Sequence, residues 1–278
     1  MIFCINTKEL FIQNAQANNI SNELQELLAK MQKENSTSPK KFVDIVKLKL
    51  PQFSDGKQHD AHEFILALIT VLQHENTDNQ INIYPICNIE DELGQSFLFE
   101  ILLLNNSNWY KKFLCLERIT ITCHNCNLAS IHYEASSCLS INLPTTSSTL
   151  QNLFVQCLNE FVTSTCQNCT RDQLKTIKRE MILTSKYMII HLNRFIDSNG
   201  KLSKNNVPIN PTSIKVKINE EHFLYEVKGV ISHYGNLSKG HYTFCRKSES
   251  SWIEISDKTV FYNITPPENG YLVLLEQK

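Results

Sequence analysis

Four cysteines in two Cys-x-x-Cys pairs constrain this chain more than any other feature of its sequence. Cys123 and Cys126 form the first pair, Cys166 and Cys169 form the second, and residues 127–165 lie between them. A two-residue gap lets one tight turn present both sulfurs to a single metal ion at about 2.3 Å. Two such turns supply the four ligands of a tetrahedral structural site. The sequence therefore predicts a zinc ion bound by these four thiolates.

Cysteines have two other common roles, as buried small side chains and as disulfide partners. The chain begins without a basic segment and apolar run of signal-peptide length, and no stretch reaches 18 uninterrupted apolar residues. We therefore expect a cytoplasmic or nuclear protein with no membrane association, where reduced thiols favour metal over disulfides. Apart from Cys4, which is treated below, the unpaired cysteines are expected to be packing residues: Cys87, Cys115, Cys138, Cys157 and Cys245.

Composition argues against two classes of function. A formal net charge of −1 does not provide the positive field that drives nucleic-acid binding. The chain has seven glycines and neither Gly-x-Gly-x-x-Gly nor Gly-Lys-Ser/Thr, which argues against a phosphate-binding loop. At 278 residues it is long enough to bury a sizeable core.

Helical spacing marks the first third of the chain. Apolar residues predict helices over Ile20–Met31 and Lys41–Leu48. A third helix is predicted beyond Ser54 and Asp55, which are candidate caps, because five apolar residues recur on one face: Ala61, Phe64, Ile65, Leu68 and Leu72.

The remainder is typical of β-structure, apart from helical spacing over Leu150–Phe161. The segments rich in apolar and β-branched residues are predicted strands: Phe97–Leu103, Phe113–Thr122, Tyr187–Asn193, Tyr225–Ser232, His241–Arg246, Ser251–Ile255 and Tyr271–Leu275. Asp197–Asn210 and Thr145–Thr149, rich in polar residues, are expected to be exposed loops. A helical first third followed by strands indicates an α+β fold.

Several segments, in this order, resemble the catalytic domain of the ubiquitin-specific proteases, a papain-like family of cysteine deubiquitinases. Pro51-Gln-Phe-Ser-Asp-Gly-Lys-Gln-His-Asp-Ala-His-Glu-Phe-Ile resembles the family's glutamine box. Ile189-Ile-His-Leu-Asn-Arg-Phe resembles its Leu-x-Arg-Phe strand, and His233-Tyr-Gly through Gly240-His-Tyr-Thr resembles its histidine box. Gly270-Tyr-Leu-Val-Leu-Leu resembles the terminal strand, and the two cysteine pairs fall in the expected interval.

The resemblance implies a single domain over residues 1–278 shaped like a hand. Residues 1 to about 80 would form a helical thumb, about 112–182 zinc-tipped β fingers, and the remainder a β palm. Fingers of this kind grip ubiquitin, whose tail lies between thumb and palm. The resemblance implies that Gln58, Asp60 and Glu63 bind the tail and its arginines, and that Gly240 and Tyr242 line the tail channel. A solvated helix face is the alternative for Asp60 and Glu63.

By the same resemblance, His241 is the catalytic histidine. The family's third catalytic group is normally an acid or amide that precedes an Asp, in the register Trp-x-x-x-Asp-Asp-x-x-Val. Here the register begins at Trp252 and places Ser256 at the usual position and Asp257 directly after it. We expect Asp257 to take over orientation of the imidazole, because a one-residue shift can be absorbed by a turn, whereas a Ser256 hydroxyl is a weaker, uncharged acceptor.

The family's cysteine box, Gly-Asn-Thr-Cys-x-x-Asn, has no counterpart in the 278 residues. Met1-Ile-Phe-Cys-Ile-Asn-Thr-Lys-Glu-Leu resembles instead the segment a few turns after that box. We therefore expect that this sequence lacks the nucleophile. Cys4 is a poor substitute, since it lacks the Gly-Asn-Thr turn and a helix N-terminus to lower its pKa.

Three functions remain in competition. The first is a deubiquitinase that hydrolyses the isopeptide bond after ubiquitin's C-terminal glycine, represented here by an incomplete sequence. The second is a pseudoenzyme that binds ubiquitin or holds partners without cleavage, which the missing box and Ser256 favour. The third, a zinc-ribbon protein acting on nucleic acid, leaves the glutamine and histidine boxes unexplained and conflicts with the net charge.

Overall fold

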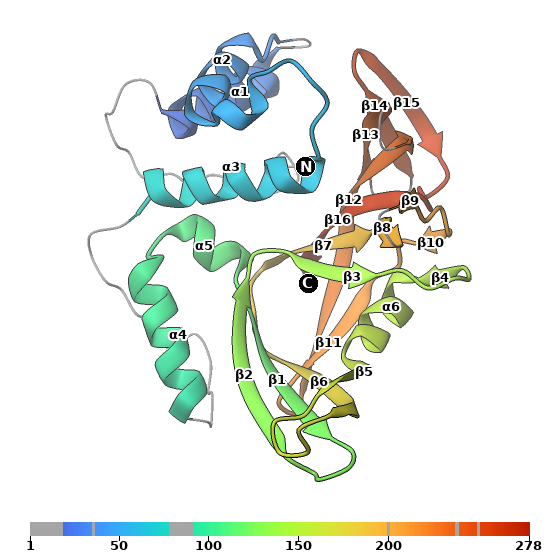
Figure 1. Ribbon diagram of the computed structural model, residues 1–278. Coiled ribbons are helices and arrows are strands. Elements are labelled where there is room, and N and C mark those ends of the chain that lie inside the picture. Colours follow the sequence, from blue (N-terminus) through green and yellow to red (C-terminus); the bar gives the residue numbers. More distant parts are fainter. Residues whose placement is uncertain (1–18, 35–36, 78–91, 199–200, 237–238, 249–250) are drawn as a thin grey trace. The chain divides into compact units, whose positions relative to one another are not determined.

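The computed structural model describes residues 19–34, 37–77, 92–198, 201–236, 239–248 and 251–278. The chain forms two compact units, which are treated one at a time (Figure 1). The smaller unit comprises Ile2–Asn82 and Leu102–Lys112, and the larger comprises Ile83–Ile101 and Phe113–Lys278. No helix in the described part of the chain has both the length and the apolar character that a membrane crossing needs.

The smaller unit is helical, as its apolar periodicity predicts. Its elements are α1 (Ile20–Lys33), α2 (Lys40–Lys49), the 3₁₀ turn η2 (Pro51–Phe53), α3 (Ala61–Glu75) and α5 (Asn108–Phe113), whose last residue belongs to the larger unit. The carboxylate of Glu75 ends α3 and accepts hydrogen bonds from the backbone amides of Ile20 and Ser21 at 3.0 and 2.7 Å. It thereby satisfies amides at the start of α1 that have no partner inside the helix.

The start of α3 differs from the expected one. Asp60 is the N-cap, and its Oδ1 accepts hydrogen bonds from the amides of His62 and Glu63 at 2.8 and 3.0 Å. The candidates Ser54 and Asp55 are therefore not the caps. Asp55 instead orders the preceding turn, where hydrogen bonds from the Lys57 amide and the His59 ring lower the pKa of its carboxyl to about 2.

Two other segments depart from their predicted structure. Phe97–Leu103 is part of the helix α4 (Glu92–Leu104) and is not a strand. An almost continuous apolar run fits a buried strand and an apolar helix equally well, so spacing did not separate them. The helix predicted over Leu150–Phe161 ends early: α6 spans Leu150–Cys157, and Phe161 lies on the strand β5 (Asn159–Thr165).

A four-stranded antiparallel sheet in the larger unit carries the cysteine pairs at its ends. Its order is β2-β1-β6-β5, with β1 (Cys115–Cys123), β2 (Ala129–Ser136) and β6 (Asp172–Thr184) beside β5. Figure 1 shows β1 and β2 as a long hairpin in green, with the first cysteine pair at its turn. The second pair lies in the β5–β6 connection, so strand pairing brings the two connections to the same end of the sheet.

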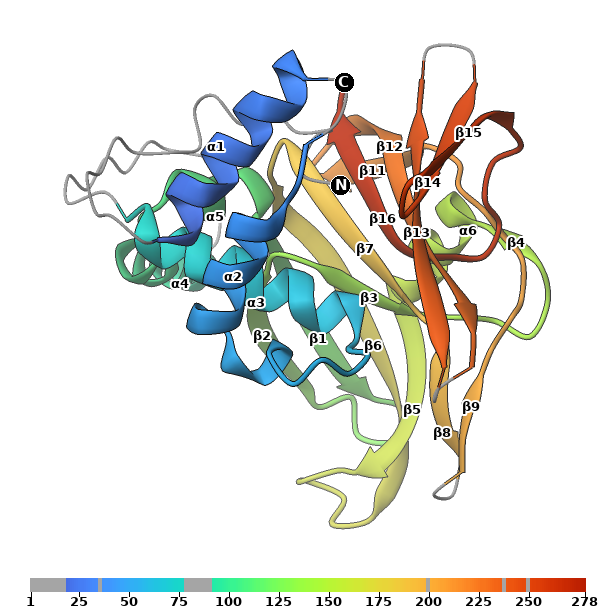
Figure 2. The same ribbon diagram turned by 90° about the horizontal axis from the view of Figure 1, so that it is seen from above.

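An eight-stranded sheet forms the rest of the framework. Seven strands follow the order β15-β14-β13-β12-β16-β7-β3, and β11 pairs with β12 in addition. In Figure 2, β13, β14 and β15 (orange to red) form one edge. The bounds are β3 (Leu139–Asn142), β7 (Tyr187–Asn193), β11 (Ile214–Ile218), β12 (Glu221–Gly235), β13 (Gly240–Lys247), β14 (Trp252–Ser256), β15 (Thr259–Ile264) and β16 (Gly270–Gln277).

Two short strand pairs complete the larger unit. The parallel pair joins β4 (Ser148–Thr149) to β10 (Ile209–Asn210), and the antiparallel hairpin joins β8 (Phe195–Ser198) to β9 (Lys201–Lys204). The expectation of an exposed loop over Asp197–Asn210 is therefore wrong for the end of β8, for β9 and for β10, and that over Thr145–Thr149 is wrong for β4. α6 buries Leu150, Leu153 and Phe154 in the core of the eight-stranded sheet, and Cys157 packs against this core, as its place in the apolar stripe predicts.

Removal of the Asp60 cap is expected to destabilise the smaller unit. Asp60→Ala deletes the acceptor for two amides and should lower the free energy of unfolding by about 1 kcal/mol. Asp60→Asn keeps an acceptor of similar capping strength and should lose much less. Urea unfolding followed by circular dichroism measures both variants. Equal stability of the alanine variant and the wild type would contradict a capping role for Asp60.

Candidate functional site

The two Cys-x-x-Cys segments fold into turns with the same hydrogen-bond pattern. The amide of Cys123 donates to the carbonyl of Leu128, and the amide of Asn127 donates back to the carbonyl of Cys123. In the second turn, Cys166 and Thr170 take the places of Cys123 and Asn127 and make equivalent bonds. Asn127 and Thr170 both adopt left-handed backbone angles, with φ of 56° and 55°. Each turn therefore closes just after its second cysteine.

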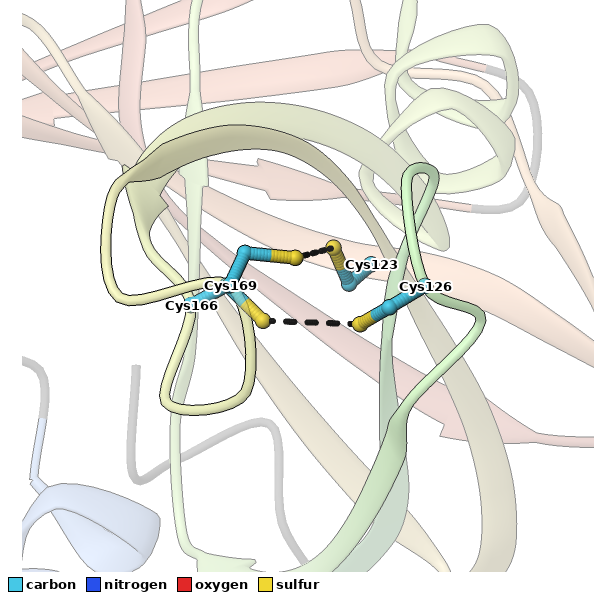
Figure 3. Close-up of side chains that lie close together, drawn as sticks. All are labelled: Cys123, Cys126, Cys166 and Cys169. Atoms are coloured by element: carbon cyan, nitrogen blue, oxygen red, sulfur yellow. Dashed lines mark hydrogen bonds between the residues drawn. The ribbon is translucent and has the colours of Figure 1, made fainter.

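The four sulfurs face one another across these turns, as predicted (Figure 3). Sγ of Cys123 lies 4.0 Å from Sγ of Cys169, and Sγ of Cys126 lies 3.7 Å from Sγ of Cys166. All four sulfurs lie within 4.8 Å of one another. Zinc bound by four thiolates at about 2.3 Å would separate them by about 3.8 Å. The cluster therefore has the ligand set and dimensions of a structural zinc site.

Neighbouring donors prepare this cluster for a cation. Hydrogen bonds from the Asn168 side chain and then from the Leu128 amide lower the pKa of Cys126 to about 6. The Asn125 side chain donates to Sγ of Cys169 at 3.3 Å and lowers the pKa of that thiol, but burial and hydrogen bonds with Cys126, Cys166 and Cys123 outweigh it and raise the pKa of Cys169 to about 11. The donors therefore favour a thiolate, the form of cysteine that binds metal, at Cys126. His124 lies inside the first turn but its ring bonds to Thr176 Oγ1 at 2.6 Å, so it is separate from the four sulfurs.

His241 lies near the start of β13 and is held by the end of β14. Its Nε2 lies 2.8 Å from Oγ of Ser256, the last residue of β14. The His241 side chain is exposed and Ser256 is half-buried. With Nε2 engaged by the hydroxyl, Nδ1 is the nitrogen left to exchange a proton with another group.

Asp257, the expected orienting residue, begins the turn from β14 to β15. It adopts a left-handed backbone angle, with φ of 50°, a conformation that Asp tolerates better than most residues. In the described part of the chain the hydrogen-bond partner of the His241 ring is Ser256 and not Asp257. A role for Asp257 therefore stays a prediction and requires a local change in this turn.

Gly240 and Tyr242 surround a buried histidine that sequence analysis did not assign. A Cβ atom on Gly240 would overlap the ring of His233, so only glycine fits there without a shift. Tyr242 lies opposite His233 in the β12–β13 register, with ring centroids 4.7 Å apart. Phe195 and Tyr271 complete the cluster, with centroids 5.4 and 6.5 Å from that of His233.

Arg194, from the Leu-x-Arg-Phe segment, is a second buried polar residue to which sequence analysis gave no role. It is 1% exposed, and its partners among the described residues are four backbone carbonyls: those of Gly270, Asn205, Val207 and Glu268, at 2.6 to 3.1 Å. Burial without a carboxylate lowers the pKa of its guanidinium to about 10. A basic residue directly after an apolar strand was the available signal in the sequence. Its acceptors could not be predicted, because they are backbone carbonyls, which every residue has.

The predicted tail-binding residues Gln58, Asp60 and Glu63 belong to the smaller unit. Gln58 precedes α3 and is exposed, Asp60 caps the helix, and Glu63 lies exposed in its first turn. All three therefore lie at the start of one helix, and His241 belongs to the larger unit.

The thiols outside the cluster are poor candidates for a nucleophile. Burial raises the pKa of Cys138, Cys157 and Cys245 to about 12 and raises that of Cys115 still further, so all four are protonated at neutral pH. Cys4 and Cys87 lie outside the described residues. The structure therefore leaves the predicted behaviour of Cys4 untested.

Comparison with known proteins agrees with this arrangement. The family model for ubiquitin carboxyl-terminal hydrolase matches residues 3–272. Ubiquitin carboxyl-terminal hydrolase 2 of Homo sapiens is 26% identical over 248 residues, and hydrolase 4 of Eremothecium gossypii is 24% identical over 253. These alignments cover 80% and 73% of this chain but only 40% and 29% of the relatives, so the chain spans less than half of either.

Solved structures show the same mixed α+β fold. The SAGA Ubp8/Sgf11/Sus1/Sgf73 DUB module bound to ubiquitin aldehyde matches with a TM-score of 0.69 at 18% identity, over 96% of this chain and 61% of that one. A form of the module bound to monoubiquitin matches with a TM-score of 0.71, also at 18% identity, over 95% and 60%. The fold predicted from sequence is therefore confirmed.

The cysteine cluster is expected to bind one zinc ion per chain. Elemental analysis of freshly purified protein should give a ratio near one, and Cys126→Ser should reduce it sharply. Cys157→Ser, which changes a thiol outside the cluster, is the matched control and should retain zinc. Because structural zinc contributes on the order of 10 kcal/mol, chelation should loosen the four-stranded sheet while α1–α3 persist. A ratio well below one in the wild type would contradict the site.

Proposed function

Since the chain belongs to the ubiquitin carboxyl-terminal hydrolase family, we propose that it binds ubiquitin by its tail and supplies His241 to thiol-dependent hydrolysis of the bond after ubiquitin's C-terminal glycine. The hydrogen bond from His241 to Ser256 carries this proposal. It fixes an exposed imidazole through one nitrogen and leaves the other to a reacting group, as general acid–base catalysis requires.

The proposed chemistry uses His241 twice. Its Nδ1 first accepts the proton of a cysteine thiol, and the thiolate attacks the carbonyl carbon of the terminal glycine. The imidazolium then returns the proton to the departing lysine amine, which leaves a thioester that water hydrolyses. In the neutral imidazole, Nε2–H donates to Ser256 Oγ, which sets the tautomer with the lone pair on Nδ1. An uncharged hydroxyl stabilises imidazolium less than a carboxylate does.

The nucleophile is the open part of this proposal. The described thiols are either zinc-ligand candidates or protonated by burial, so the attacking cysteine is Cys4 or Cys87, which the structure does not describe, or is not among these 278 residues. We favour the last, because neither Cys4 nor Cys87 follows a Gly-Asn-Thr turn.

Recognition of ubiquitin is assigned to three parts of the chain. We assign the smaller unit to the thumb, the four-stranded sheet with its zinc to the fingers, and the eight-stranded sheet to the palm. Asp60 and Glu63 would attract the arginines near ubiquitin's tail, and the Gly240–Tyr242 strand end would line the channel for its two terminal glycines. The His233 ring already explains the glycine at position 240, so the channel assignment rests on the resemblance of Gly240-His-Tyr-Thr to the family's histidine box.

A second candidate function is a ubiquitin-binding pseudoenzyme. The observation that favours it is Ser256 itself, which bonds to His241 in the place where an acid normally stands. Such a protein would keep the tail-binding residues and the zinc and would lose only the bond cleavage. Binding and cleavage therefore need separate tests.

The acidic first turn of α3 is expected to contribute to ubiquitin binding. Glu63→Lys should weaken the affinity by about threefold to tenfold and make the remaining affinity less sensitive to salt, because an attractive charge becomes a repulsive one. Asp44→Lys makes the same charge change at an exposed site on α2 and is the control. Calorimetry that shows equal ubiquitin affinity for Glu63→Lys and Asp44→Lys would contradict a binding role for Glu63 and would favour the alternative, a solvated helix face.

A ubiquitin derivative with a thiol-reactive group at its C-terminus tests the chemistry. We expect no labelling of Cys4 in the 278-residue polypeptide, and labelling of the new cysteine when a Gly-Asn-Thr-Cys-x-x-Asn segment is joined ahead of Met1. His241→Ala should abolish that labelling. Peptide mapping by mass spectrometry identifies the site. Rapid labelling of the unmodified chain that is lost with Cys4→Ser would make Cys4 the nucleophile.

The same labelling reaction distinguishes the two candidate orienting residues. Ser256→Ala should slow it by about 10- to 100-fold, the loss expected for a hydrogen bond to a group that becomes charged. Asp257→Ala should slow it less. The reverse order would assign orientation of His241 to Asp257, as the sequence alone predicts.

A further inference from the structure

The last residues of β12, which pair with β13 near His241, have a neighbouring strand on one side only. β16 begins at Gly270, which pairs with Ser232, so residues 233–235 extend beyond it. Their other neighbour, β13, continues to the pair Gly235–Gly240. Backbone carbonyls on the side of the missing strand need other donors.

Lys204 supplies these donors. Its Nζ donates to the carbonyl of His233 at 2.6 Å and to the carbonyl of Gly235 at 3.2 Å. Alternate carbonyls of a strand point to opposite edges, so the residue between these two, Tyr234, directs its own backbone groups to β13. There its register partner is His241.

The β8–β9 hairpin delivers the ammonium to this position. Lys204 is paired with Phe195, whose ring packs on His233 with centroids 5.4 Å apart. The two paired residues therefore both contact His233: Phe195 contacts its ring, and Lys204 contacts its backbone carbonyl. Arg194, which immediately precedes Phe195, fixes the base of the hairpin through the carbonyls of Asn205 and Val207.

From these contacts we propose that Lys204 is a positioning residue for His241: it fixes the end of β12 through two of its carbonyls, and the pairing of β12 with β13 then holds the imidazole in register with Ser256. That this positioning serves catalysis rests on the proposed function. The hydrogen bonds from Lys204 to β12 do not depend on it. The turn has little tolerance elsewhere, because Gly235 has φ of 102° and a Cβ there would overlap the backbone of Lys239 and Gly240.

A lysine in this place has an energetic cost. Burial, with a smaller contribution from the charge of Arg194, lowers the pKa of Lys204. Its hydrogen-bond partners in the described part of the chain are uncharged carbonyls, which offset the desolvation of the ammonium less than a carboxylate would. An exposed position on the hairpin would avoid this cost. The two hydrogen bonds that Lys204 donates to the carbonyls at the end of β12 offset part of this cost.

Amide hydrogen exchange by NMR tests the proposal. Lys204→Met keeps the length of the side chain and removes its donors, and it should accelerate exchange at Tyr234 and His241 by about tenfold while amides in β7 stay unchanged. It should also shift the His241 ring nitrogens toward a mixture of tautomers. Lys204→Arg retains donors and should restore most of the wild-type protection. Lys247→Met, an exposed lysine on the same strand as His241, is the matched control.

Two results would overturn the proposal. One is unchanged exchange and tautomer state in Lys204→Met, and the other is acceleration spread equally over β7, which signals global destabilisation. If Lys204→Met does not fold, reductive methylation of the wild type replaces it: Lys204 should react more slowly than Lys247, and equal rates reject the contact. None of these measurements needs ubiquitin or turnover. A failure to bind ubiquitin would therefore reject the proposed function without affecting the proposed role of Lys204.

Discussion

The pairing of β12 with its neighbours is the constraint on which the rest of the larger unit depends. This strand runs from Glu221 to Gly235 and pairs with β11, β13 and β16. Its first part belongs to the hydrophobic core through Tyr225, Val227 and Val230. Its last part extends beyond β16 and carries the residues opposite His241. One strand thus couples the stability of the core to the placement of the candidate site.

Cations bonded to backbone carbonyls, rather than to acids, stabilise the irregular ends of this framework. Arg194 and Lys204 together bind six carbonyls that lie where strands end or connections begin. Sequence analysis did not predict these contacts, because a backbone carbonyl leaves no mark in the sequence. By contrast, it located the cysteine cluster, since metal ligands must be particular side chains at a particular spacing.

Periodicity predicted the fold best where one face of an element is polar. α1 and α3 follow their apolar stripes. β7 and β16 are buried on both faces, and their apolar composition located them instead: β7 has its predicted bounds, and β16 extends beyond Tyr271–Leu275 at both ends. It failed for α4, which is apolar on most sides, and at the end of α6, where Phe161 continued a helical spacing by coincidence and is exposed on a strand. It also missed the cap at Asp60, because several capping residues precede α3 and tertiary geometry selects one.

Under the proposed function, ubiquitin binding depends on residues that the structure describes, whereas cleavage depends on a cysteine that it does not. The four-cysteine cluster, the acidic start of α3 and Gly240 all lie in the described part of the chain. Hydrogen–deuterium exchange with and without ubiquitin tests this most directly. The account predicts that ubiquitin slows exchange in peptides covering both 58–63 and 240–247. Protection of neither segment at saturating ubiquitin would contradict it.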